Sequence, residues 1–374
     1  MDAQVYGLVG ASLVDAQGGY KTRPYIAGAQ KGLDNMKGLF ARSPFQFQVR
    51  DMEVPKPGDG EVLIQVKACG LCGTDLHFAA DWTEGWQPLG HEIAAEVVEV
   101  GKGVTNVKVG DKVIPEDVTM CGVCQHCKNG EPWKCRNMYS FNGQPGMAEY
   151  MALNAHMVNP FEDLDFVHAS LAEPLAVALN TVINAQIPMG GDVVVYGPGP
   201  IGLMCVRLAR LQGAAHVALI GSKRSPRETV RMQVGEELGA DVLVYGLEED
   251  PVQKVRSVFP AGAHSVIVTS PPKTLPLAVH MAQFGGTVSF IGINLGGHST
   301  VELDVNQLIF NKVTLRPTFA EPGIRFPASI RLLQAGLVDA RKLITHTFSF
   351  AEAEQMFRKN SEAREGVIKA VLVP

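Results

Sequence analysis

The chain has 374 residues, of which 46% are hydrophobic and 19% are charged, and its formal net charge is −5 at pH 7. This composition excludes a disordered chain and a basic protein that binds nucleic acid or anionic membranes, and the length favours two domains over one core. No apolar run reaches the roughly 20 residues that a membrane-spanning helix requires.

Residues 1–35 form an N-terminal extension without a clear motif. The start, MDAQVYGLVGASLVDAQ, has no basic segment and carries Asp2 and Asp15, so it does not resemble a signal or transit peptide. We therefore expect a reducing compartment, the cytoplasm, in which clustered cysteines bind metal more often than they form disulfides.

The segment from about residue 36 to residue 180 has the pattern of short β-strands. EVLIQVKA and EIAAEVVEV are apolar or alternating runs, and turns such as PKPGDG and GKGVTNVKVGD separate the strands. A β-rich domain is therefore expected in the first half of the chain.

Several residues with metal-binding side chains lie between and beside these strands. A further candidate, Glu173, lies in SLAEPLAVALN, which is expected to form a helix. One Cys, one His and one or two Glu provide fewer than four firm ligands, which is typical of a catalytic zinc that keeps a position for water or substrate. An ordinary buried or surface histidine is the alternative for His91. The candidates before the helix are Cys69, Cys72, Asp75, His77, His91 and Glu92.

Four of the seven cysteines lie in the short segment CGVCQHCKNGEPWKC, with the spacing C-x2-C-x2-C-x7-C. Two overlapping C-x2-C turns direct several thiolates to one centre, and the fourth cysteine can complete a tetrahedron. Four sulfur ligands without an open position are typical of a structural zinc site. Free or buried thiols and a redox dithiol are the alternatives. The expected ligands are Cys121, Cys124, Cys127 and Cys135.

A nucleotide-binding pattern follows in DVVVYGPGPIGLMCVRLARLQGA. Val193–Tyr196 is a β-branched run typical of a buried parallel strand, and we expect a helix from about Ile201 to Leu211. Between them stands G-x-G-x-x-G, whose glycines permit a tight turn and the close approach of a pyrophosphate to the helix N-terminus. A glycine-rich turn in an ordinary α/β unit is the alternative. The expected cofactor-binding residues here are Gly197, Gly199, Pro200, Ile201 and Gly202.

The turn after the second strand, HVALIG, bears on the choice of cofactor. NAD sites carry Asp or Glu about 20 residues after the glycines, where it binds the ribose hydroxyls. This chain has Gly221 and Ser222 there, followed by Lys223 and Arg224, with Arg227 nearby. Cations without a carboxylate favour a 2′-phosphate, so the turn favours NADP over NAD. A solvated basic turn is the alternative.

Taken together, the motifs resemble those of the zinc-dependent medium-chain dehydrogenase/reductase family, most of all its sorbitol (polyol) dehydrogenase branch. The resemblance extends from Met36 to Pro374, and CGTDLH, GHE, the four-cysteine segment, EPLAVALN and the glycine pattern occur in the family's order. It implies an α/β fold, with a GroES-like β-rich catalytic domain at residues 36–180. A Rossmann domain with a doubly wound parallel sheet would follow at residues 181–317. Residues 318–374 would return to the catalytic domain, and the active site would lie between the domains.

The resemblance also implies roles for individual residues. Cys72 rather than Cys69 would bind the catalytic zinc together with His91, Glu92 and Glu173. Thr74 and His77 would pass the substrate proton to solvent, and Asp75 would orient the zinc-bound histidine. Zinc would act as a Lewis acid on the alcohol oxygen while hydride moves to the nicotinamide.

The implied function is oxidation of a polyol or sugar alcohol at a secondary carbon with NADP or NAD. An aldose, threonine or general secondary-alcohol dehydrogenase remains an alternative. A catalytically silent zinc protein and a zinc-free quinone reductase are disfavoured, because the catalytic ligands are all present. We expect a small-molecule substrate and a homodimer or homotetramer, with no nucleic-acid or membrane partner.

Six further residues are weighed as substrate contacts. Two tryptophans lie in the region that shapes the pocket in relatives, and either could equally be a core residue. The four residues after the nucleotide domain are more typical of structural roles. The six are Trp82, Trp86, Phe319, Glu321, Arg325 and Phe326.

Overall fold

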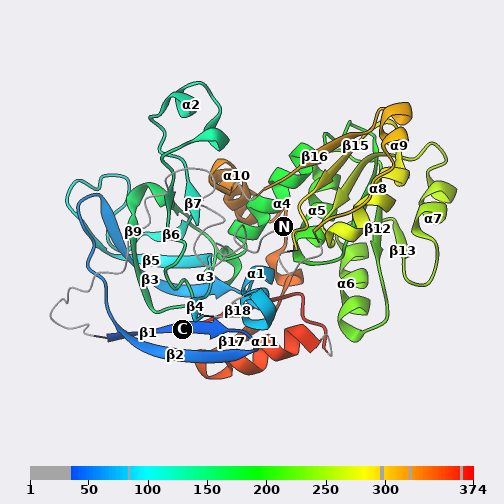
Figure 1. Ribbon diagram of the computed structural model, residues 1–374. Helices are drawn as coiled ribbons and strands as arrows, with labels where there is room; N and C mark the ends of the chain where they lie inside the picture. Colours follow the sequence, from blue (N-terminus) through cyan, green and yellow to red (C-terminus); the bar gives the residue numbers. More distant parts are fainter. Residues whose placement is uncertain (1–34, 83–84, 295–298, 320–321, 363–364) are drawn as a thin grey trace, which may run out of the picture.

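The computed structural model describes residues 35–82, 85–294, 299–319, 322–362 and 365–374. Figure 1 shows a β-rich part that holds β1 to β10 and a second part built on a parallel sheet, with α4 and α10 between them. The N-terminal extension expected at residues 1–35 falls almost entirely outside the described residues, and β1 begins at its last residue, Asn35.

The β-rich part contains three sheets. A seven-stranded sheet has the order β10-β6-β5-β3-β18-β17, with β9 also pairing with β3. A three-stranded sheet has the order β2-β1-β4, and β7 pairs with β8. The strands are β1 (Asn35–Arg42), β2 (Gln46–Glu53), β3 (Glu61–Gly70), β4 (Gln87–Pro88), β5 (Glu92–Val100), β6 (Lys112–Pro115), β7 (Val118–Thr119), β8 (Tyr139–Ser140), β9 (Tyr150–Asn154), β10 (Val158–Pro160), β17 (Ile344–Phe348) and β18 (Lys369–Leu372).

The large sheet combines strands from the first half of the chain with the two C-terminal strands. β18 pairs antiparallel with β3, so the C-terminal segment lies beside a strand of the first half. Ile64 of β3 and Ile93 of β5 are fully buried in the core of this part. Burying each such aliphatic side chain contributes about 1.5–3 kcal/mol. This packing fixes the ends of β3 and β5, where the candidate metal ligands stand.

The second part is a six-stranded parallel sheet of order β13-β12-β11-β14-β15-β16. This is the doubly wound Rossmann order, in which the cofactor crevice lies beside the first strand. The strands are β11 (Asp192–Tyr196), β12 (His216–Gly221), β13 (Val242–Tyr245), β14 (Ala263–Val268), β15 (Ala282–Phe290) and β16 (Thr314–Pro317). The helices of this part are α5 (Pro200–Leu211), α6 (Pro226–Glu237), α7 (Pro251–Val258), α8 (Leu275–Met281) and α9 (Val305–Asn311).

The remaining helices connect or cover the sheets. The longer ones are α4 (Ala172–Asn184), α10 (Pro322–Gln334) and α11 (Ala353–Glu362), and the short ones are α1 (Gly73–His77), α2 (Gln125–Lys128) and α3 (Phe166–Ala169). A π-helical turn spans Phe78–Trp82, and 3-10 turns span Pro132–Lys134, Ala155–Met157, Pro272–Thr274, Ala340–Lys342 and Phe350–Glu352.

Helix α4 is tied to the parallel sheet. Ser265 Oγ donates to the carbonyl of Ala185 at 2.8 Å, and Ser289 Oγ donates to the carbonyl of Thr181 at 3.0 Å. The span Phe166–Asn184 is long and apolar enough to cross a membrane, but 72% of its most apolar window is buried inside the protein. This span is therefore a segment of the protein core. It contains Glu173 in the first turn of α4.

Candidate active site and metal centre

Cys72 and His91 are brought together by the pairing of β3 with β5. The two strands are antiparallel with Gly70 opposite Glu92, so the residues just beyond these positions meet at one end of the sheet. The Sγ atom of Cys72, a ring nitrogen of His91 and a carboxylate oxygen of Glu92 lie within 4.8 Å of one another. Thiolate, imidazole and carboxylate at this spacing suit a zinc ion.

Cys69 is not part of this group. Its side chain is fully buried in the core of the β-rich part, and burial raises the pKa of its thiol well above the usual range. A buried protonated thiol is a poor metal ligand, because the thiolate is the binding form.

Glu92 is also held by a lysine from the far end of the chain. Lys369 Nζ donates to both carboxylate oxygens of Glu92, at 2.6 and 2.8 Å, and to the carbonyl of Leu71 at 3.0 Å. Burial lowers the pKa of Lys369, but the negative charges of Glu92, Cys72 and Glu173 outweigh burial and raise it. Glu92 therefore has a buried cationic partner before any metal ion is considered.

The backbone at Gly70 leaves room for this carboxylate. A Cβ at Gly70 would stand 2.0 Å from Oε2 of Glu92, so a larger residue would displace the glutamate.

Glu173 is a neighbour of the group formed by Cys72, His91 and Glu92, and its charge acts on His91. Within the described residues it is not one of the side chains whose ligand atoms all lie within 4.8 Å of one another. It is buried in the first turn of α4. Burial raises the pKa of its carboxyl group well above the usual range, and the negative charge of Asp117 raises that pKa further.

The pKa of His91 is also raised. Burial lowers this pKa, but the negative charges of Cys72, Asp75 and Glu173 outweigh burial and raise it.

Asp75 stabilises the loop that carries the ligands. Its Oδ2 accepts a hydrogen bond from the backbone N–H of Cys72 at 3.0 Å, and its Oδ1 accepts one from Gly90 at 2.9 Å. Asp75 thus holds the backbone beside both Cys72 and His91, and its charge acts on the His91 ring.

Thr74 and His77 occupy one short helix, α1, that leads from the ligands to the surface. Thr74 Oγ1 lies 3.8 Å from Cys72 Sγ. The His77 side chain is 49% exposed, and its Nδ1 is 3.6 Å from Oδ1 of Asp81. The Thr74 hydroxyl thus lies beside the candidate ligand Cys72, and the His77 imidazole lies at the surface one helical turn further on.

The four-cysteine segment forms a second centre. Figure 1 shows α2 in a lobe that projects from the β-rich part. Sγ–Sγ distances are 3.5 Å between Cys124 and Cys127, 3.9 Å between Cys124 and Cys135, and 3.5 Å between Cys135 and Cys121. A tetrahedral zinc site with Zn–S bonds of about 2.3 Å needs sulfurs about 3.8 Å apart, so the four residues fit the ion.

The surroundings of this lobe favour a thiolate at Cys124 but not at Cys127, because burial raises the pKa of the Cys127 thiol to about 12. The N–H groups of Cys121 and Cys124 donate to the Sγ atoms of Cys135 and Cys121, both at 3.4 Å. The backbone N–H of Cys127 lowers the pKa of the Cys124 thiol to about 6. All seven cysteines of the chain lie in the described residues, and none forms a disulfide.

The glycine pattern occupies the turn between β11 and α5. Gly197 has φ +114°, and a Cβ there would stand 2.8 Å from Thr269 Oγ1. At Gly202 a Cβ would stand 1.8 Å from the carbonyl oxygen of Gly197, so helix and strand approach too closely for any side chain. Gly199 faces open space beside the N-terminus of the helix, which begins with Pro200 and Ile201. This turn can accept a pyrophosphate.

The basic turn after β12 is only partly free to meet a cofactor. Ser222 is buried, and Lys223 Nζ lies 4.7 Å from the centre of the Tyr245 ring. Arg224 Nη2 donates to the carbonyl of Leu247 at 2.7 Å. Arg227 points elsewhere, because its Nη1 donates to the carbonyl of Asn360 in α11.

The residues weighed as substrate contacts are scattered. Trp86 is stacked with the guanidinium groups of Arg42 and Arg50, at 4.9 and 5.2 Å from its ring centre. Phe326 is fully buried, whereas Phe319 is 52% exposed. Arg325 Nε donates to Asn180 Oδ1 at 3.3 Å. Glu321 lies outside the described residues, and so does the side chain of Trp82.

Three residues near these sites were not anticipated from the sequence. Lys369 interrupts the apolar run GVIKAVLVP, and a lone charge in such a run is a signal of a buried partner. Thr269 follows β14 at the carboxyl edge of the sheet and donates to the carbonyl of Gly197 at 2.9 Å. Asp117 stands between β6 and β7, and its charge acts on Glu173 and His91.

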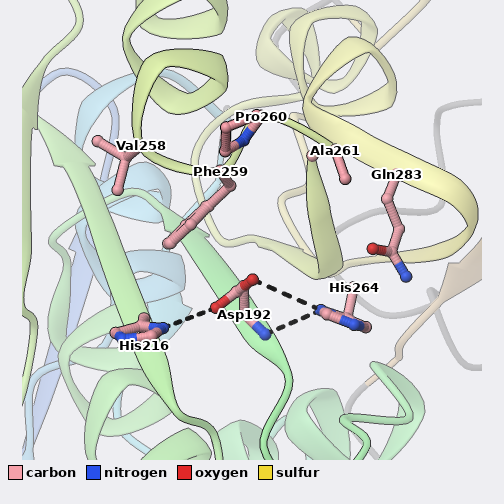
Figure 2. A pocket seen from close by; sticks show the side chains of 9 residues that line it. Asp192, His216, Val258, Phe259, Pro260, Ala261, His264 and Gln283 are labelled. Carbon is pink, nitrogen blue, oxygen red and sulfur yellow. Dashed lines mark hydrogen bonds and ion pairs between the residues drawn. The ribbon is translucent and has the colours of Figure 1, made fainter.

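A separate hollow of about 280 Å³ lies at the other edge of the parallel sheet. Figure 2 shows Asp192 between His216, 2.8 Å away, and His264, which accepts a hydrogen bond from the Asp192 N–H at 2.9 Å. Asp192 and His216 begin β11 and β12, so the hollow is at the amino ends of the strands. Cofactors of Rossmann sheets bind at the carboxyl ends, and this hollow is therefore not the cofactor site.

The doubly wound sheet and the cysteine–histidine–glutamate centre define a nucleotide-binding oxidoreductase of the zinc type. Comparison with known families agrees with this class. Residues 58–163 match the alcohol dehydrogenase GroES-like domain, and residues 200–335 match the zinc-binding dehydrogenase domain. The chain belongs to the zinc-dependent medium-chain dehydrogenase/reductase family and is an NAD(P)-dependent oxidoreductase.

Named relatives cover nearly the whole chain. L-Threonine 3-dehydrogenase of Pyrococcus furiosus is 33% identical over 86% of this chain and 94% of its own length. Sorbitol dehydrogenase of Bacillus subtilis is 26% identical over 91% of this chain and 98% of its own length.

Solved structures agree in fold and cofactor class. A zinc-binding dehydrogenase structure from Sinorhizobium meliloti 1021 with bound NADP has a TM-score of 0.81 and 29% identity, and covers 91% of this chain and 99% of that one. An alcohol dehydrogenase of Escherichia coli CFT073 in complex with NADH has a TM-score of 0.81 and 25% identity, and covers 91% of this chain and all of that one. The fold is thus α/β, with a GroES-like part and a Rossmann part, as expected.

Proposed function

We propose that the chain oxidises a secondary hydroxyl of a polyol or sugar alcohol and transfers hydride to NADP or NAD. The observation that carries the proposal is the clustering of Cys72, His91 and Glu92 next to Glu173, in a chain that also holds an open glycine turn. The family and its cofactors are established by the comparisons, and the substrate class is the proposed element.

The proposed roles follow from where the side chains stand. Cys72, His91, Glu92 and Glu173 would hold the catalytic zinc, which when bound supplies a Lewis acid for the alcohol oxygen. Glu92 would be shared between the metal centre and Lys369. Thr74 would accept the substrate proton, and the exposed imidazole of His77 would release it to solvent.

The four-cysteine lobe is proposed to bind a second, structural zinc ion. Its sulfur spacing supports this assignment, because four thiolates leave no position for substrate. The metal would hold together a lobe in which most residues between the cysteines are exposed, including the apolar Val123 and Trp133.

NADP is the proposed preferred cofactor. The support is the absence of an acid at Gly221 and Ser222 and the exposed cation of Lys223. Arg224 is partly committed to Leu247 and Glu248, so Lys223 carries more of this argument. Gly197, Gly199, Pro200, Ile201 and Gly202 would hold the pyrophosphate.

The proposal also covers the domain boundaries, the oligomeric state and the cellular location. Residues 36–180 and 318–374 would form the catalytic domain and residues 181–317 the nucleotide domain, which agrees with β17 and β18 joining the sheet of β3. Residues 1–35 would be an extension. A homodimer or homotetramer is proposed, supported by the exposed apolar residues Ile309 and Phe310 near the outer strand β16. Free, clustered thiols support a cytoplasmic location.

The test is nicotinamide absorbance with zinc-replete protein and a panel of hexitols, pentitols, aldoses, threonine and simple secondary alcohols, each with NADP and NAD. Turnover of a polyol, faster with NADP, is expected. Threonine is the second candidate substrate, because threonine 3-dehydrogenases share 33% identity with this chain. Turnover of threonine alone would replace the polyol proposal. Metal analysis should find two zinc ions per chain, whereas one would indicate a silent protein.

A further inference from the structure

Asp117 carries a buried carboxylate oxygen that has no partner. The residue lies between β6 and β7, and its backbone carbonyl accepts a hydrogen bond from Phe141 at 3.3 Å. Its Oδ1 atom is shielded from solvent and has no hydrogen-bond partner among the described residues. Most buried polar atoms in proteins are paired, and leaving one unpaired costs about 1–3 kcal/mol. Such an oxygen calls for a functional explanation.

Its surroundings connect Asp117 to the candidate metal centre. The charges of His91 and Glu92 both act on Asp117. Asp117 in turn is the strongest charged influence on Glu173. Asp117 is outside the group of ligand atoms formed by Cys72, His91 and Glu92. The unpaired Oδ1 of Asp117, within the electrostatic reach of His91 and Glu92, is therefore a candidate acceptor for a donor group of a substrate that binds at this centre.

We propose that Asp117 is a specificity-determining residue, whose free oxygen accepts a hydrogen bond from a donor on the carbon next to the reacting alcohol. The donor is a hydroxyl in a polyol or an ammonium in a 2-amino alcohol. Both present an N–H or O–H to a carboxyl oxygen, and both would satisfy the unpaired Oδ1. This inference rests on the proposed alcohol oxidation and names the feature of the substrate that the site selects.

The neighbouring residue provides a matched control. Glu116 is also buried and also has one oxygen, Oε2, without a partner. Its other oxygen accepts a hydrogen bond from Asn159 at 2.7 Å, and Oε2 lies toward Thr119 and Gly323 rather than the metal centre. A Glu116→Gln variant therefore changes a buried carboxylate of the same loop without changing the group proposed to meet the substrate.

The kinetic experiment compares the wild type, Asp117→Asn and Glu116→Gln with paired substrates. One pair is 2,3-butanediol and 2-butanol, and the other is threonine and 3-hydroxybutyrate, so that each pair differs in one donor. Hydrogen bonds to charged groups contribute about 1.5–3 kcal/mol, which corresponds to about 10- to 150-fold. For Asp117→Asn we expect kcat/KM to fall about 10- to 100-fold for the donor-bearing member of one pair, with less than about 3-fold change for its partner.

The pair that responds identifies the donor. A fall confined to butanediol assigns a hydroxyl, and a fall confined to threonine assigns an ammonium. Equal falls for both members of each pair, or a Glu116→Gln variant that reproduces the selective loss, would overturn the proposal. Zinc content and NADP binding should be the same in all three proteins, which separates substrate selection from damage to the fold.

A binding measurement tests the inference without turnover. Pinacol is a vicinal diol that cannot be oxidised by hydride transfer, and 2,3-dimethyl-2-butanol is its counterpart with one hydroxyl. With zinc and NADP bound, calorimetry should show the wild type binding pinacol at least about 10-fold more tightly, and Asp117→Asn losing that difference. The same comparison between 1-amino-2-methyl-2-propanol and tert-butyl alcohol, neither of which can be oxidised by hydride transfer, reports on an ammonium donor. If the wild type prefers neither donor-bearing compound, the assignment of Asp117 fails, whereas absent turnover with retained preference would refute only the proposed reaction.

Discussion

Replacing Lys369 with Met would remove the ammonium group that donates to both carboxylate oxygens of Glu92. Lys369 and Glu92 have side chains that are 5% and 1% exposed, and the ammonium donates to both carboxylate oxygens and to the carbonyl of Leu71. Breaking one side of a buried ion pair leaves an uncompensated charge and costs about 3–5 kcal/mol. We expect the free energy of unfolding to fall by that amount in Lys369→Met.

Urea denaturation followed by tryptophan fluorescence would measure the loss, with metal-chelated and zinc-loaded protein in parallel. The double variant Lys369→Met/Glu92→Gln should recover at least about 2 kcal/mol relative to the sum of the single variants, because it removes both charges. Lys369→Arg is the conservative control and should lose less than Lys369→Met. A loss below about 1 kcal/mol in chelated Lys369→Met, or strict additivity in the double variant, would refute the reasoning.

Four other predictions follow from single sites. Cys124→Ser should lower the zinc content, measured by metal analysis, from two ions to one per chain, because the four-sulfur site loses one of its ligands. Gly202→Ala should abolish NADP binding in a calorimetric titration, since its Cβ would stand 1.8 Å from a carbonyl oxygen. Lys223→Ala should raise the Kd for NADP about 10-fold and change that for NAD little. Burial raises the pKa of Glu116 from 4.5 to about 7, so the folded state retains a proton that the unfolded chain releases. The stability of the wild type relative to Glu116→Gln should fall by about 3 kcal/mol as pH rises from 4.5 to 7.

Each of these has a direct counter-result. Two zinc ions in Cys124→Ser would remove that residue from the ligand set, and full NADP affinity in Gly202→Ala would mean that the turn relaxes. Equal weakening of NADP and NAD by Lys223→Ala would contradict a contact with the 2′-phosphate. A constant stability difference between the wild type and Glu116→Gln across the pH range would show that Glu116 titrates normally in the folded protein.

The sequence by itself determined the groups that are close along the chain. The four cysteines, the glycine turn and the pair His91 and Glu92 depend on short spacings, and the backbone over so few residues has few ways to arrange them. The β-branched run that became β11 was recognisable for the same reason, because a strand buried on both faces is apolar throughout. The resemblance to the zinc-dependent medium-chain dehydrogenases then connected these separate motifs to one predicted function.

Only the tertiary structure decided which distant residues meet. Lys369 lies 277 positions from Glu92 and reaches it because β18 pairs with β3. Arg227 seemed placed for the cofactor by its nearness to the basic turn, yet the direction of α6 takes it to Asn360. The sixth strand, β16, is short and contains Arg316 and Pro317, so its pattern was too weak to predict without its partner β15. A local pattern such as the lone charge in GVIKAVLVP can indicate that Lys369 is buried, but its partner depends on long-range strand pairing, which involves the whole chain.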